Sequence, residues 1–390
     1  MAQGRRYRIL HILEATVGGT REHILQVLRG LDQSIFDLTL ICSVERDPAF
    51  NEDIANLRQA GVRVIVIPMA RPIRPWRDLV ALVRITAHLL TTRYDIVHTH
   101  SSKAGFLGRF AAWIAGAERI YHTGHIFYFQ WRPHTVAGWF YRLLEWLVAR
   151  LTTRIIALSP QQRDLLIRCG VARPSQARVI ENGVRLQDWA DLPAPNECRE
   201  KMGLPQSALV LGMAARLEPQ KGCAHFLRAA KLVLKEMPDI HFVLVGEGSL
   251  ASRLEAMAKE ISIGDRFHLL GHWRDMRCFY AALDLFVLTS LWEGMPYVIL
   301  EAMASGRPVC ATDIPGTREI IRDGDTGALV PAEDDPALAG RIIELLRNPG
   351  QRARMAARAG RLVEERFTTK RFLAELQSLY LADLAGRRQP

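Results

Sequence analysis

The stretch Asp284-Leu-Phe-Val-Leu-Thr289, which leads into Glu293-Gly-Met-Pro-Tyr-Val-Ile-Leu-Glu301, shows the unit from which the fold is built. Its first part is an apolar run of strand length. Its second part passes from a glycine into a helical pattern that ends at Gly306, a residue type common at helix C-termini. A buried strand followed by a loop and a helix is the repeating unit of parallel α/β sheets.

The junction between this loop and this helix presents two carboxylates and several free backbone N–H groups. Pro296 suits the first helical position, because its missing N–H would be unpaired there anyway. Glu293 then lies just past the carboxyl end of the strand, and Glu301 lies about a turn and a half into the helix. The N–H groups of Tyr297 and Val298 at the helix start form an anion site.

The same alternation of strands and helices runs through the chain twice. In the first half the expected strands are 8–13, 38–42, 62–67, 95–98, 119–123, 154–158 and 178–180. In the second half they are 209–214, 241–245, 267–270, 285–289, 309–311 and 328–330. Between the two series, residues 186–205 form a polar stretch that prolines interrupt. The pattern predicts two Rossmann-like, doubly wound parallel sheets.

These boundaries predict three parts. They are an N-terminal domain over residues 1–190, a second domain over 191–367, and a C-terminal helical segment over 368–390 that packs back on the first domain. Because ligands of such sheets bind at the carboxyl ends of the strands, we expect the catalytic cleft between the facing edges of the two domains.

Composition narrows the class of protein. The chain has 390 residues with 49% hydrophobic content, which suits two globular domains. Its apolar stretches are too short or too charged to span a membrane, and its first eight residues lack the apolar core of a signal peptide. The six cysteines have no metal-ligand spacing, so we expect reduced thiols in a cytoplasmic protein.

The positive charge lies in the first half of the chain. Residues 1–185 hold 25 Lys and Arg against 14 Asp and Glu, whereas the remaining residues hold 26 against 27. A solvated surface, an anionic membrane and a phosphorylated acceptor are all compatible with this asymmetry. Nucleic acid is not expected as a partner, because the arginines are dispersed and no binding motif accompanies them. The helical stretch Gly138–Arg150 combines aromatic residues with arginines; we expect it to pack on the sheet, and contact with a membrane is the alternative. The stretch Arg71–Arg84 is a comparable candidate for contact with lipid headgroups.

Two loops after first strands carry candidate anion-binding groups. Gly18 and Gly19 follow the first strand and allow close backbone approach, although the third glycine of the dinucleotide fingerprint is missing. In the second domain, Arg216 and Lys221 lie five apart on the corresponding loop, and together they suit a diphosphate. Surface cations beside a plain turn are the alternative.

Metal binding is not expected. His98 and His100 stand at one strand end and His122 and His125 at the next, but no third ligand follows a zinc spacing. The pair Asp323-Gly-Asp325 lies in a glycine-rich turn, which ordinary turn chemistry explains.

Taken together, these residues resemble the retaining nucleotide-sugar glycosyltransferases of family 4, also called group 1, which have the GT-B fold. The resemblance covers nearly the whole chain. It rests on Gly18-Gly19, His98-Thr-His-Ser-Ser-Lys-Ala-Gly105, Thr123-Gly-His125, Ile180-Glu-Asn-Gly-Val184, Arg216 with Lys221, and the E-x7-E motif from Glu293 to Glu301.

The resemblance implies a role for each matching residue. The implied donor-binding residues are Gly18, Gly19, Arg216, Lys221, Gly294, Met295, Tyr297, Val298 and Glu301. The implied catalytic residues are His125, Arg216, Lys221 and Glu293, and the implied acceptor contacts are His100, Lys103 and Ile126. In detail, Glu293 would contact the transferring sugar and Glu301 the ribose. Pro296 and Ile126 depart from the family, since each stands where many members have glycine.

The implied activity is metal-independent, retaining transfer of a hexose or N-acetylhexosamine from a nucleotide sugar, most commonly UDP-linked. The expected acceptor is a glycan or a lipid-linked glycan of surface polysaccharide synthesis, with peripheral contact at the inner face of the plasma membrane; a soluble acceptor is the alternative. A non-hydrolysing nucleotide-sugar epimerase, a silent binding subunit and an NAD-dependent dehydrogenase are competing classes. The sequence does not determine the sugar, the nucleotide, the linkage or the oligomeric state.

Overall fold

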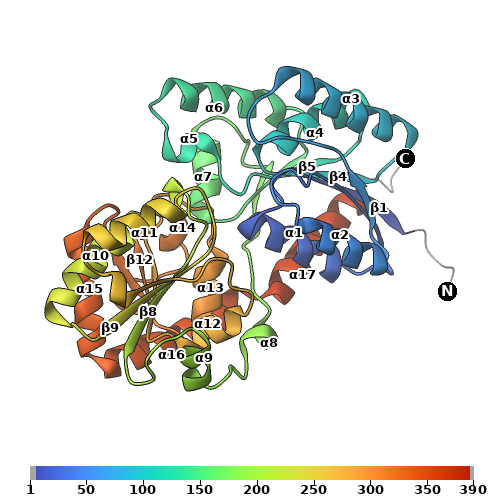
Figure 1. Cartoon of the computed structure of the whole chain (residues 1–390). Helices are drawn as coiled ribbons and strands as arrows, with labels where there is room; N and C mark the ends of the chain where they lie inside the picture. The colour runs from blue at the N-terminus through green and yellow to red at the C-terminus, as the bar shows by residue number, and fades with distance from the viewer. Residues whose placement is uncertain (1–5, 387–390) are drawn as a thin grey trace. The chain divides into compact units, whose positions relative to one another are not determined.

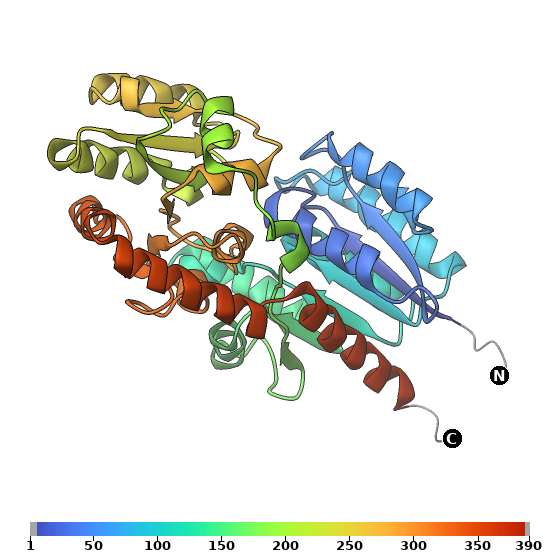
Figure 2. The same cartoon turned by 90° about the horizontal axis from the view of Figure 1, so that it is seen from below.

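The structure is a computed structural model that describes residues 6–386 and divides them into two compact units. Unit 1 contains the chain up to Glu181 and again from Phe372 onward, and unit 2 is Asn182–Arg371. Each unit holds one parallel sheet with helices between its strands (Figures 1 and 2). The predicted α/β fold with two doubly wound sheets is therefore confirmed.

The sheet of unit 1 has seven parallel strands in the order β3-β2-β1-β4-β5-β6-β7. These strands are β1 (Tyr7–Leu13), β2 (Phe36–Cys42), β3 (Arg63–Val66), β4 (Ile96–His100), β5 (Ile120–Thr123), β6 (Arg154–Ala157) and β7 (Ala177–Val179). The helices of this unit are α1 (Gly18–Gly30), α2 (Phe50–Gln59), α3 (Pro75–Thr91), α4 (Ser102–Ile114), α5 (Tyr128–Trp131), α6 (Val136–Ala149), α7 (Pro160–Arg168) and α17 (Thr369–Ala385), which lies in unit 1 from Phe372 onward.

Two apolar layers cover the two faces of this sheet, because successive side chains of a strand point to opposite faces. On β1, Ile9 and Leu13 join a core that α1, α2 and α17 complete. Leu10 and Ile12 join a second core that α3 and α4 complete. In Figure 1, α1, α2 and α17 accordingly lie on one side of the sheet and α3 and α4 on the other.

Helix α17 is tied to the unit 1 sheet by polar as well as apolar contacts. Asp383 forms a two-point ion pair with Arg154, whose Nε and Nη2 each lie 2.7 Å from a carboxylate oxygen. The Tyr121 hydroxyl also donates to Asp383. A two-point arginine–carboxylate pair fixes direction as well as distance, so it holds the helix in one register against β5 and β6.

The sheet of unit 2 has six parallel strands in the order β10-β9-β8-β11-β12-β13. They are β8 (Leu209–Ala214), β9 (Ile240–Val245), β10 (Phe267–Leu269), β11 (Leu285–Leu288), β12 (Val309–Thr312) and β13 (Ala328–Val330). The helices are α8 (Leu186–Trp189), α9 (Pro195–Lys201), α10 (Cys223–Glu236), α11 (Ala251–Glu260), α12 (Met276–Ala282), α13 (Tyr297–Ala304), α14 (Pro315–Arg318), α15 (Asp335–Arg347) and α16 (Pro349–Arg366), with short 3-10 helices η1 (Pro219–Lys221) and η2 (Gly264–Arg266).

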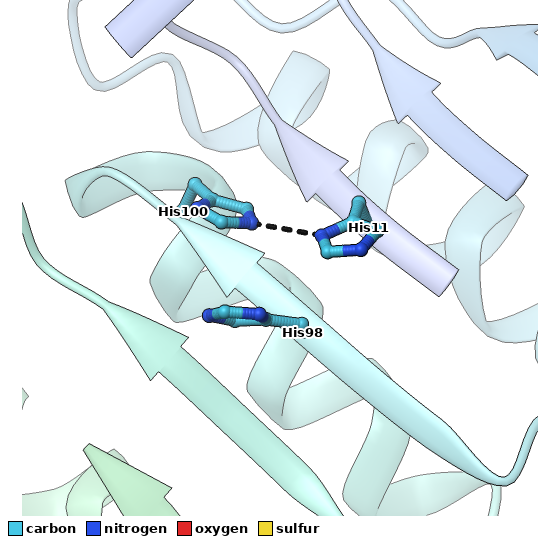
Figure 3. Close-up of side chains that lie close together, drawn as sticks. All are labelled: His11, His98 and His100. Atoms are coloured by element: carbon cyan, nitrogen blue, oxygen red, sulfur yellow. Dashed lines mark hydrogen bonds between the residues drawn. The ribbon is translucent and has the colours of Figure 1, made fainter. Parts of the chain in front are cut away.

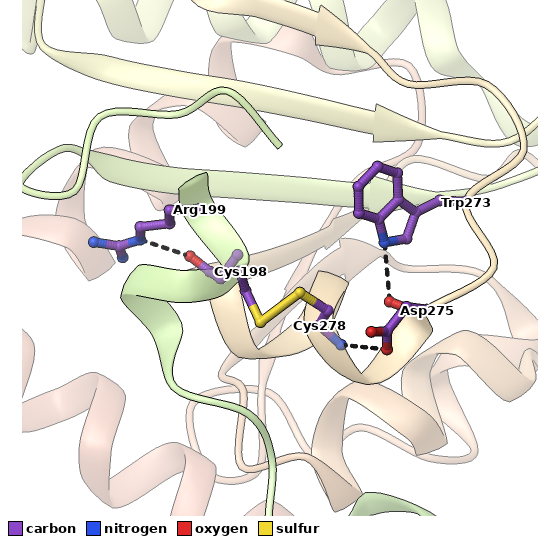
Figure 4. Close-up of a disulfide and its surroundings, with 6 residues drawn as sticks. Cys198, Arg199, Trp273, Asp275 and Cys278 are labelled. Carbon is purple, nitrogen blue, oxygen red and sulfur yellow. Dashed lines mark hydrogen bonds between the residues drawn. A yellow bond between two sulfur atoms is a disulfide. The ribbon is translucent and has the colours of Figure 1, made fainter. Parts of the chain in front are cut away.

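A disulfide joins two helices of unit 2. Cys198 of α9 is bonded to Cys278 of α12, while the other four cysteines are free (Figure 4). Beside it, the Cys278 N–H donates to Asp275, which caps α12 at 3.0 Å. The expectation that all six cysteines are reduced packing thiols is therefore wrong for this pair, because the fold brings together two residues that are 80 apart in sequence.

All thirteen expected strands are present, with ends that differ by up to two residues from the predicted ones. Two local expectations need correction. Pro296 precedes α13 as its N-cap instead of occupying its first helical position. In α6, Trp139 and Leu143 are exposed, so most of the apolar side of this helix does not pack on the sheet, and only its end, with Ala149, joins the core beside β6. Among the described residues, no helix is long and apolar enough to cross a membrane.

Candidate functional site

The first group of site residues lies in unit 2, where β11 ends and its loop begins. Glu293 in this loop is only 6% exposed. The Ser290 hydroxyl donates to Glu293 Oε1 at 2.7 Å, and the Lys221 ammonium forms an ion pair with the same oxygen. The structure thus brings together Lys221 and Glu293, two residues that the sequence singled out separately. A carboxylate held by a hydroxyl and an ammonium has a fixed direction.

A second loop, after β8, supplies the cations. The Arg216 Nη2 group donates to the Gln220 side chain at 3.2 Å. The side-chain amide of Gln220 in turn donates to the carbonyl oxygen of Trp292 at 2.9 Å. The backbone carbonyl of Gln220 accepts from the Leu291 N–H at 2.8 Å. These bonds lock the loop after β8 to the loop after β11. Because β8 and β11 are neighbouring strands, both loops leave the same edge of the sheet.

Gly222 makes the close approach of these loops possible. Its φ is 62°, and a Cβ at this position would lie 2.1 Å from the carbonyl oxygen of Thr289. The Thr289 hydroxyl also donates to the Gly222 carbonyl at 3.0 Å. Only glycine combines this left-handed backbone with so little space. Lys221, the preceding residue, is positioned by this turn.

Helix α13 carries the second carboxylate of the E-x7-E motif. Tyr297 and Val298 form the start of this helix, where the dipoles of the helical peptide units favour an anion. The Tyr280 hydroxyl lies 2.9 Å from Glu301 Oε2 and 3.1 Å from the Val298 carbonyl oxygen. Burial raises the pKa of Tyr280 well above its ordinary value, and the Glu301 carboxylate adds to this effect. Tyr280 therefore stays protonated and holds Glu301 in place as a donor.

The loop between Glu293 and α13 is closely packed within unit 2. Asn182, from the Ile180–Val184 motif, donates its side-chain amide to the Met295 carbonyl at 3.4 Å. A Cβ at Gly316 would lie 2.6 Å from the Gly294 carbonyl oxygen. The predicted donor residues Gly294 and Met295 are therefore held by backbone contacts, and Met295 is buried.

These residues form a cationic, donor-rich edge. Arg216, Lys221 and the first N–H groups of α13 lie where β8 and β11 end, and all can donate to phosphate oxygens. Glu301 remains partly exposed. The arrangement suits an anion that carries hydroxyl groups next to it.

The second group lies in unit 1 and consists of buried histidines. His11 on β1 and His98 on β4 are register partners, and His100 follows two residues later on the same face. His11 Nδ1 and His100 Nε2 are 3.1 Å apart, within hydrogen-bond distance (Figure 3). This face is the one that α1 and α17 cover, and His23 of α1 lies against His100 with ring centroids 5.5 Å apart.

His98 has a structural role in this cluster. Its Nδ1 lies 2.5 Å from the Tyr380 hydroxyl of α17, and its Nε2 lies 2.9 Å from the Thr123 hydroxyl. Both ring nitrogens are thus occupied. His122 belongs elsewhere: it points to the opposite face of the sheet, where its Nδ1 lies 3.0 Å from the Thr99 hydroxyl.

His125 differs from its neighbours in its backbone. Its φ is 54°, a left-handed value that costs a residue with a Cβ about 1 kcal/mol or more. The Gln162 side chain donates to its carbonyl at 3.2 Å, and its ring packs edge-on against His23 at 4.7 Å. The buried nitrogens His125 Nε2 and His100 Nδ1 have no hydrogen-bond partner within the described chain. Such unsatisfied buried atoms are rare and need a reason.

Burial keeps these imidazoles neutral. Desolvation, together with a smaller effect of the neighbouring His23, lowers the pKa of His11 to about 3. The pKa values of His98, His100 and His125 also lie well below the ordinary value, mainly through burial and secondarily through the other histidines. At neutral pH the cluster can therefore donate and accept hydrogen bonds without carrying charge.

Two histidine trios come close enough to be considered for metal. One is His11, His98 and His100, the other His23, His100 and His125, each with ring nitrogens within 4.8 Å of one another. Spacing in the sequence could not reveal His11 or His23 as third members. In the first trio, the nitrogens of His98 are already engaged by Tyr380 and Thr123.

The Asp323-Gly-Asp325 turn directs its carboxylates apart. Asp323 accepts the Leu329 N–H at 2.9 Å, and Asp325 pairs with Arg358 at 2.5 Å. Gly324 has a φ of 74°. This is turn chemistry, as the sequence indicated.

The remaining predicted residues, all in unit 1, differ in burial and in their partners. Gly18 begins α1 with a φ of 54°, and Gly19 follows in the first turn, whose N–H groups the helix itself leaves unused. His100 is fully buried in the histidine cluster. The Lys103 ammonium is tied to Asp78 and to the Pro72 carbonyl, both at 2.6 Å. Ile126 is partly exposed beside His125.

Several residues of these two groups were not predicted from the sequence. They are His11, His23, Gln220, Gly222, Tyr280 and Ser290. Two of them could have been found from their position in the sequence. Gly222 directly follows Lys221, and Ser290 follows the expected strand 285–289, three residues before Glu293. Tyr280 could not have been found, because its contact with Glu301 depends on how α12 packs beside α13.

Two family models match the chain. Residues 17–188 match the family described as Glycosyltransferase Family 4, and residues 196–361 match Glycosyl transferases group 1. A UDP-Gal:alpha-D-GlcNAc-diphosphoundecaprenol alpha-1,3-galactosyltransferase from Escherichia coli is 33% identical and covers 87% of each chain. The putative glycosyltransferase EpsD of Bacillus subtilis strain 168 is 30% identical over 81% of this chain and 84% of its own.

Solved structures share the fold at lower identity. The Anabaena protein Alr3699/HepE in complex with UDP and glucose aligns with a TM-score of 0.84 at 22% identity, over 97% of this chain and 100% of that one. Sucrose-phosphate synthase from Thermosynechococcus elongatus aligns with a TM-score of 0.81 at 20% identity, again over 97% and 100%.

Proposed function

Because this chain belongs to the group 1 glycosyltransferases of family 4, which have the GT-B fold, we propose that it transfers a hexose or N-acetylhexosamine from a UDP-linked sugar to a lipid-linked glycan, with retention at the anomeric carbon. The Escherichia coli relative is named as a galactosyltransferase acting on a diphosphoundecaprenol acceptor. A further relative, from Staphylococcus aureus, is named as the capsular polysaccharide biosynthesis glycosyltransferase CapM. These names support synthesis of a surface polysaccharide.

The observation that carries the proposal is the locked pair of loops in unit 2. Lys221 and Arg216 supply cations for a diphosphate, and the N–H groups that begin α13 supply further donors. Glu301, which Tyr280 orients, is assigned to the ribose hydroxyls as a hydrogen-bond acceptor. Glu293, oriented by Ser290, is assigned to hydroxyls of the transferring sugar.

The ion pair between Lys221 and Glu293 suggests how the donor is received. Without a ligand, Lys221 compensates the buried Glu293 carboxylate. When a diphosphate binds, the ammonium has a second anionic partner, and Glu293 gains sugar hydroxyls as donors in exchange. The two residues therefore couple recognition of the sugar to recognition of the diphosphate.

For the chemical step, we propose attack on the same face of the sugar from which the diphosphate leaves. Retention by double displacement would need a carboxylate nucleophile beneath the anomeric carbon. Glu293 is held by Lys221 and Ser290, which lowers its capacity to act as one. The departing diphosphate would accept the acceptor's proton, while Arg216 and Lys221 stabilise its developing charge. His125 would contact the sugar as a neutral group, through the otherwise unsatisfied Nε2.

We assign the protein to the cytoplasmic face of the membrane, where nucleotide sugars and lipid-linked acceptors meet. The basic residues of the first half of the chain support peripheral contact with anionic lipid. No metal or other cofactor enters the proposed reaction. Transfer to a soluble glycan is the alternative for the acceptor.

A nucleotide-sugar panel tests the proposal. Thermal unfolding is followed with UDP, GDP and their hexose and N-acetylhexosamine conjugates, since a ligand at 100 times its Kd adds about 2.7 kcal/mol of stability. The stabilising sugar is then incubated with and without a diphosphate-linked polyprenol acceptor. Acceptor-dependent release of UDP with an α-linked product from an α-linked donor is expected. Conversion of the sugar to its epimer without acceptor would instead establish a nucleotide-sugar epimerase.

A further inference from the structure

Unit 1 exposes large hydrophobic side chains on the helices α3, α4 and α6 and at Ile73, just before α3. All those that the structure shows as exposed within residues 6–386 lie between Ile73 and Leu147. They are Ile73, Trp76, Leu79, Val80, Val83, Leu90, Trp113, Ile114, Val136, Trp139, Phe140, Leu143, Trp146 and Leu147. Trp76 is 76% exposed and Val136 is 88% exposed. We call this surface the α3–α4–α6 face; α3 packs on α4, and α4 packs on α6.

These side chains follow the helix period, so they form stripes. In α3, Trp76, Leu79, Val80 and Val83 recur at intervals of three, four and seven residues from Trp76. In α6, the residues from Val136 to Leu147 recur in the same way. Such a stripe normally turns toward the protein core. Here it turns outward, while a separate inner side of α3, with Ala81, Ile85 and Leu89, fills the core.

Charge on the same segment is strongly positive. Residues 71–150 contain eleven Lys and Arg but only four Asp and Glu. The acidic side chains are engaged within the unit: Asp78 pairs with Lys103, and Glu145 pairs with Arg109. Arginines border the apolar stripes, and the Arg150 guanidinium lies 3.3 Å from the Trp146 ring centroid. Tryptophan beside arginine is characteristic of the boundary between headgroups and acyl chains.

From this combination we propose that the α3–α4–α6 face inserts into the headgroup region of an anionic phospholipid bilayer. The inference deepens the proposed function and rests on it for the need to reach a lipid-linked acceptor. The helices would lie in the plane of the membrane, with the stripes at the acyl boundary and the arginines among phosphates. A second copy of this chain fits less well, because two faces with the same net positive charge would repel each other.

Vesicle binding by the full-length protein provides the test. Sedimentation is measured with vesicles of phosphatidylglycerol and of phosphatidylcholine, and tryptophan fluorescence is measured with lipids brominated along their acyl chains. We expect binding to phosphatidylglycerol that weakens at high salt, together with quenching by the brominated lipids. The double variant Trp139→Ser/Leu143→Ser should lower the partition coefficient about tenfold or more, since it removes two inserted apolar side chains.

Matched controls separate insertion from general charge and from misfolding. Arg347→Ser and Arg358→Ser remove exposed cations of unit 2 and should leave partitioning unchanged. The double variant should keep the wild-type unfolding temperature and its turnover of a short, water-soluble acceptor, while transfer to a vesicle-embedded acceptor falls. Absence of vesicle binding by the wild type, with transfer intact, would overturn the inference and leave the proposed function standing. A wild-type dimer that the double variant converts to monomer would also overturn it.

Discussion

The polar groups near the strand ends are neutral in unit 1 and charged in unit 2. In unit 1, the ends of β1 and β4 carry buried histidines that contact one another and stay neutral. In unit 2, the ends of β8 and β11 carry a buried ion pair, Lys221 with Glu293, and a neighbouring arginine. Both sheets are parallel and doubly wound, so the fold alone does not produce the difference.

The contrast indicates what each unit can bind. A diphosphate needs cations and oriented N–H groups, and these occur together in unit 2. Neutral imidazoles suit uncharged hydroxyl groups, which a sugar presents. If this division is correct, the two units should respond differently to pH, to substitution and to chelation.

Acid should produce the largest effect, and it should act on unit 1. Because folding lowers the pKa values of His11, His98, His100 and His125, the unfolded state binds protons more readily than the folded state. The free energy of unfolding is therefore unaffected by these groups above the unfolded pKa of about 6.5. It decreases as pH falls from that value toward the folded pKa values. For His11, whose folded pKa is about 3, this penalty is about 2 kcal/mol at pH 5. Calorimetry between pH 8 and pH 5 should show the transition of unit 1 falling first.

A single substitution checks the origin of this acid sensitivity. His11→Asn removes one buried imidazole and should flatten the dependence of unfolding temperature on pH. His134→Asn, at an exposed position, should leave the slope as it is. If both variants kept the wild-type slope, the neutral cluster would not explain the behaviour of unit 1.

Replacement of Lys221 by alanine should have the largest effect on catalysis. Loss of one donor to a leaving group typically raises the barrier by about 3 to 4 kcal/mol, which corresponds to two to three decades in kcat. Arg216→Ala should cause a loss of the same order. A loss of less than threefold for either would remove that residue from the diphosphate site.

The Lys221 variant also leaves Glu293 buried without its cation, so folding must be measured in parallel. The double variant Lys221→Ala/Glu293→Gln removes the unpaired charge and should regain most of any lost stability. Activity should stay low in the double variant. Recovery of activity together with stability would mean that Lys221 acts only by compensating Glu293.

The sequence predicted the sheets well and the site only in part. Apolar runs of strand length located all thirteen strands, because burial on both faces of a parallel sheet leaves a strong local pattern. Arg216, Lys221, Glu293 and Glu301 could be proposed from the sequence because loops after such strands often carry function. The pairing of Lys221 with Glu293, and of Glu301 with Tyr280, depends on contacts between residues 72 and 21 apart, which no local pattern encodes.

Which histidines cluster could not be predicted from the sequence either. Their positions on strands were evident, but alternation separates His98 and His100 from His122 and places His11 beside them. The disulfide between Cys198 and Cys278 was missed for a similar reason, since only the packing of α9 on α12 brings the two residues together.

Gly222→Ala should weaken the donor site of unit 2 at the turn that positions Lys221. The left-handed φ of 62° and the nearby Thr289 carbonyl oppose any Cβ, so we expect a cost of about 1 to 3 kcal/mol in stability and reduced donor binding. Gly340→Ala, at a helical position with open space around it, is the matched control and should be neutral or stabilising. Titration with UDP and thermal unfolding measure both consequences.

Glu301→Ala should act mainly on donor affinity. A hydrogen bond to a charged group contributes about 1.5 to 3 kcal/mol, so UDP binding should weaken roughly tenfold to a hundredfold while kcat changes less. Tyr280→Phe should reproduce a smaller part of this loss, because it removes only the group that orients Glu301. Calorimetric titration with UDP and with UMP measures the change in nucleotide affinity. A fall in kcat with unchanged UDP affinity would place Glu301 in the chemical step instead.

Chelation should have the smallest effect of all, because the proposed leaving-group stabilisation uses cations of the chain itself. Turnover should be the same within error after dialysis against EDTA. Asp323 and Asp325 point to different partners, and His98 has both ring nitrogens engaged, so neither set is arranged for an ion. Loss of turnover that magnesium or manganese restores would indicate a metal site at Asp323 and Asp325. Loss that zinc restores would point to His23, His100 and His125, and the division between a neutral unit 1 and a charged unit 2 would then fail.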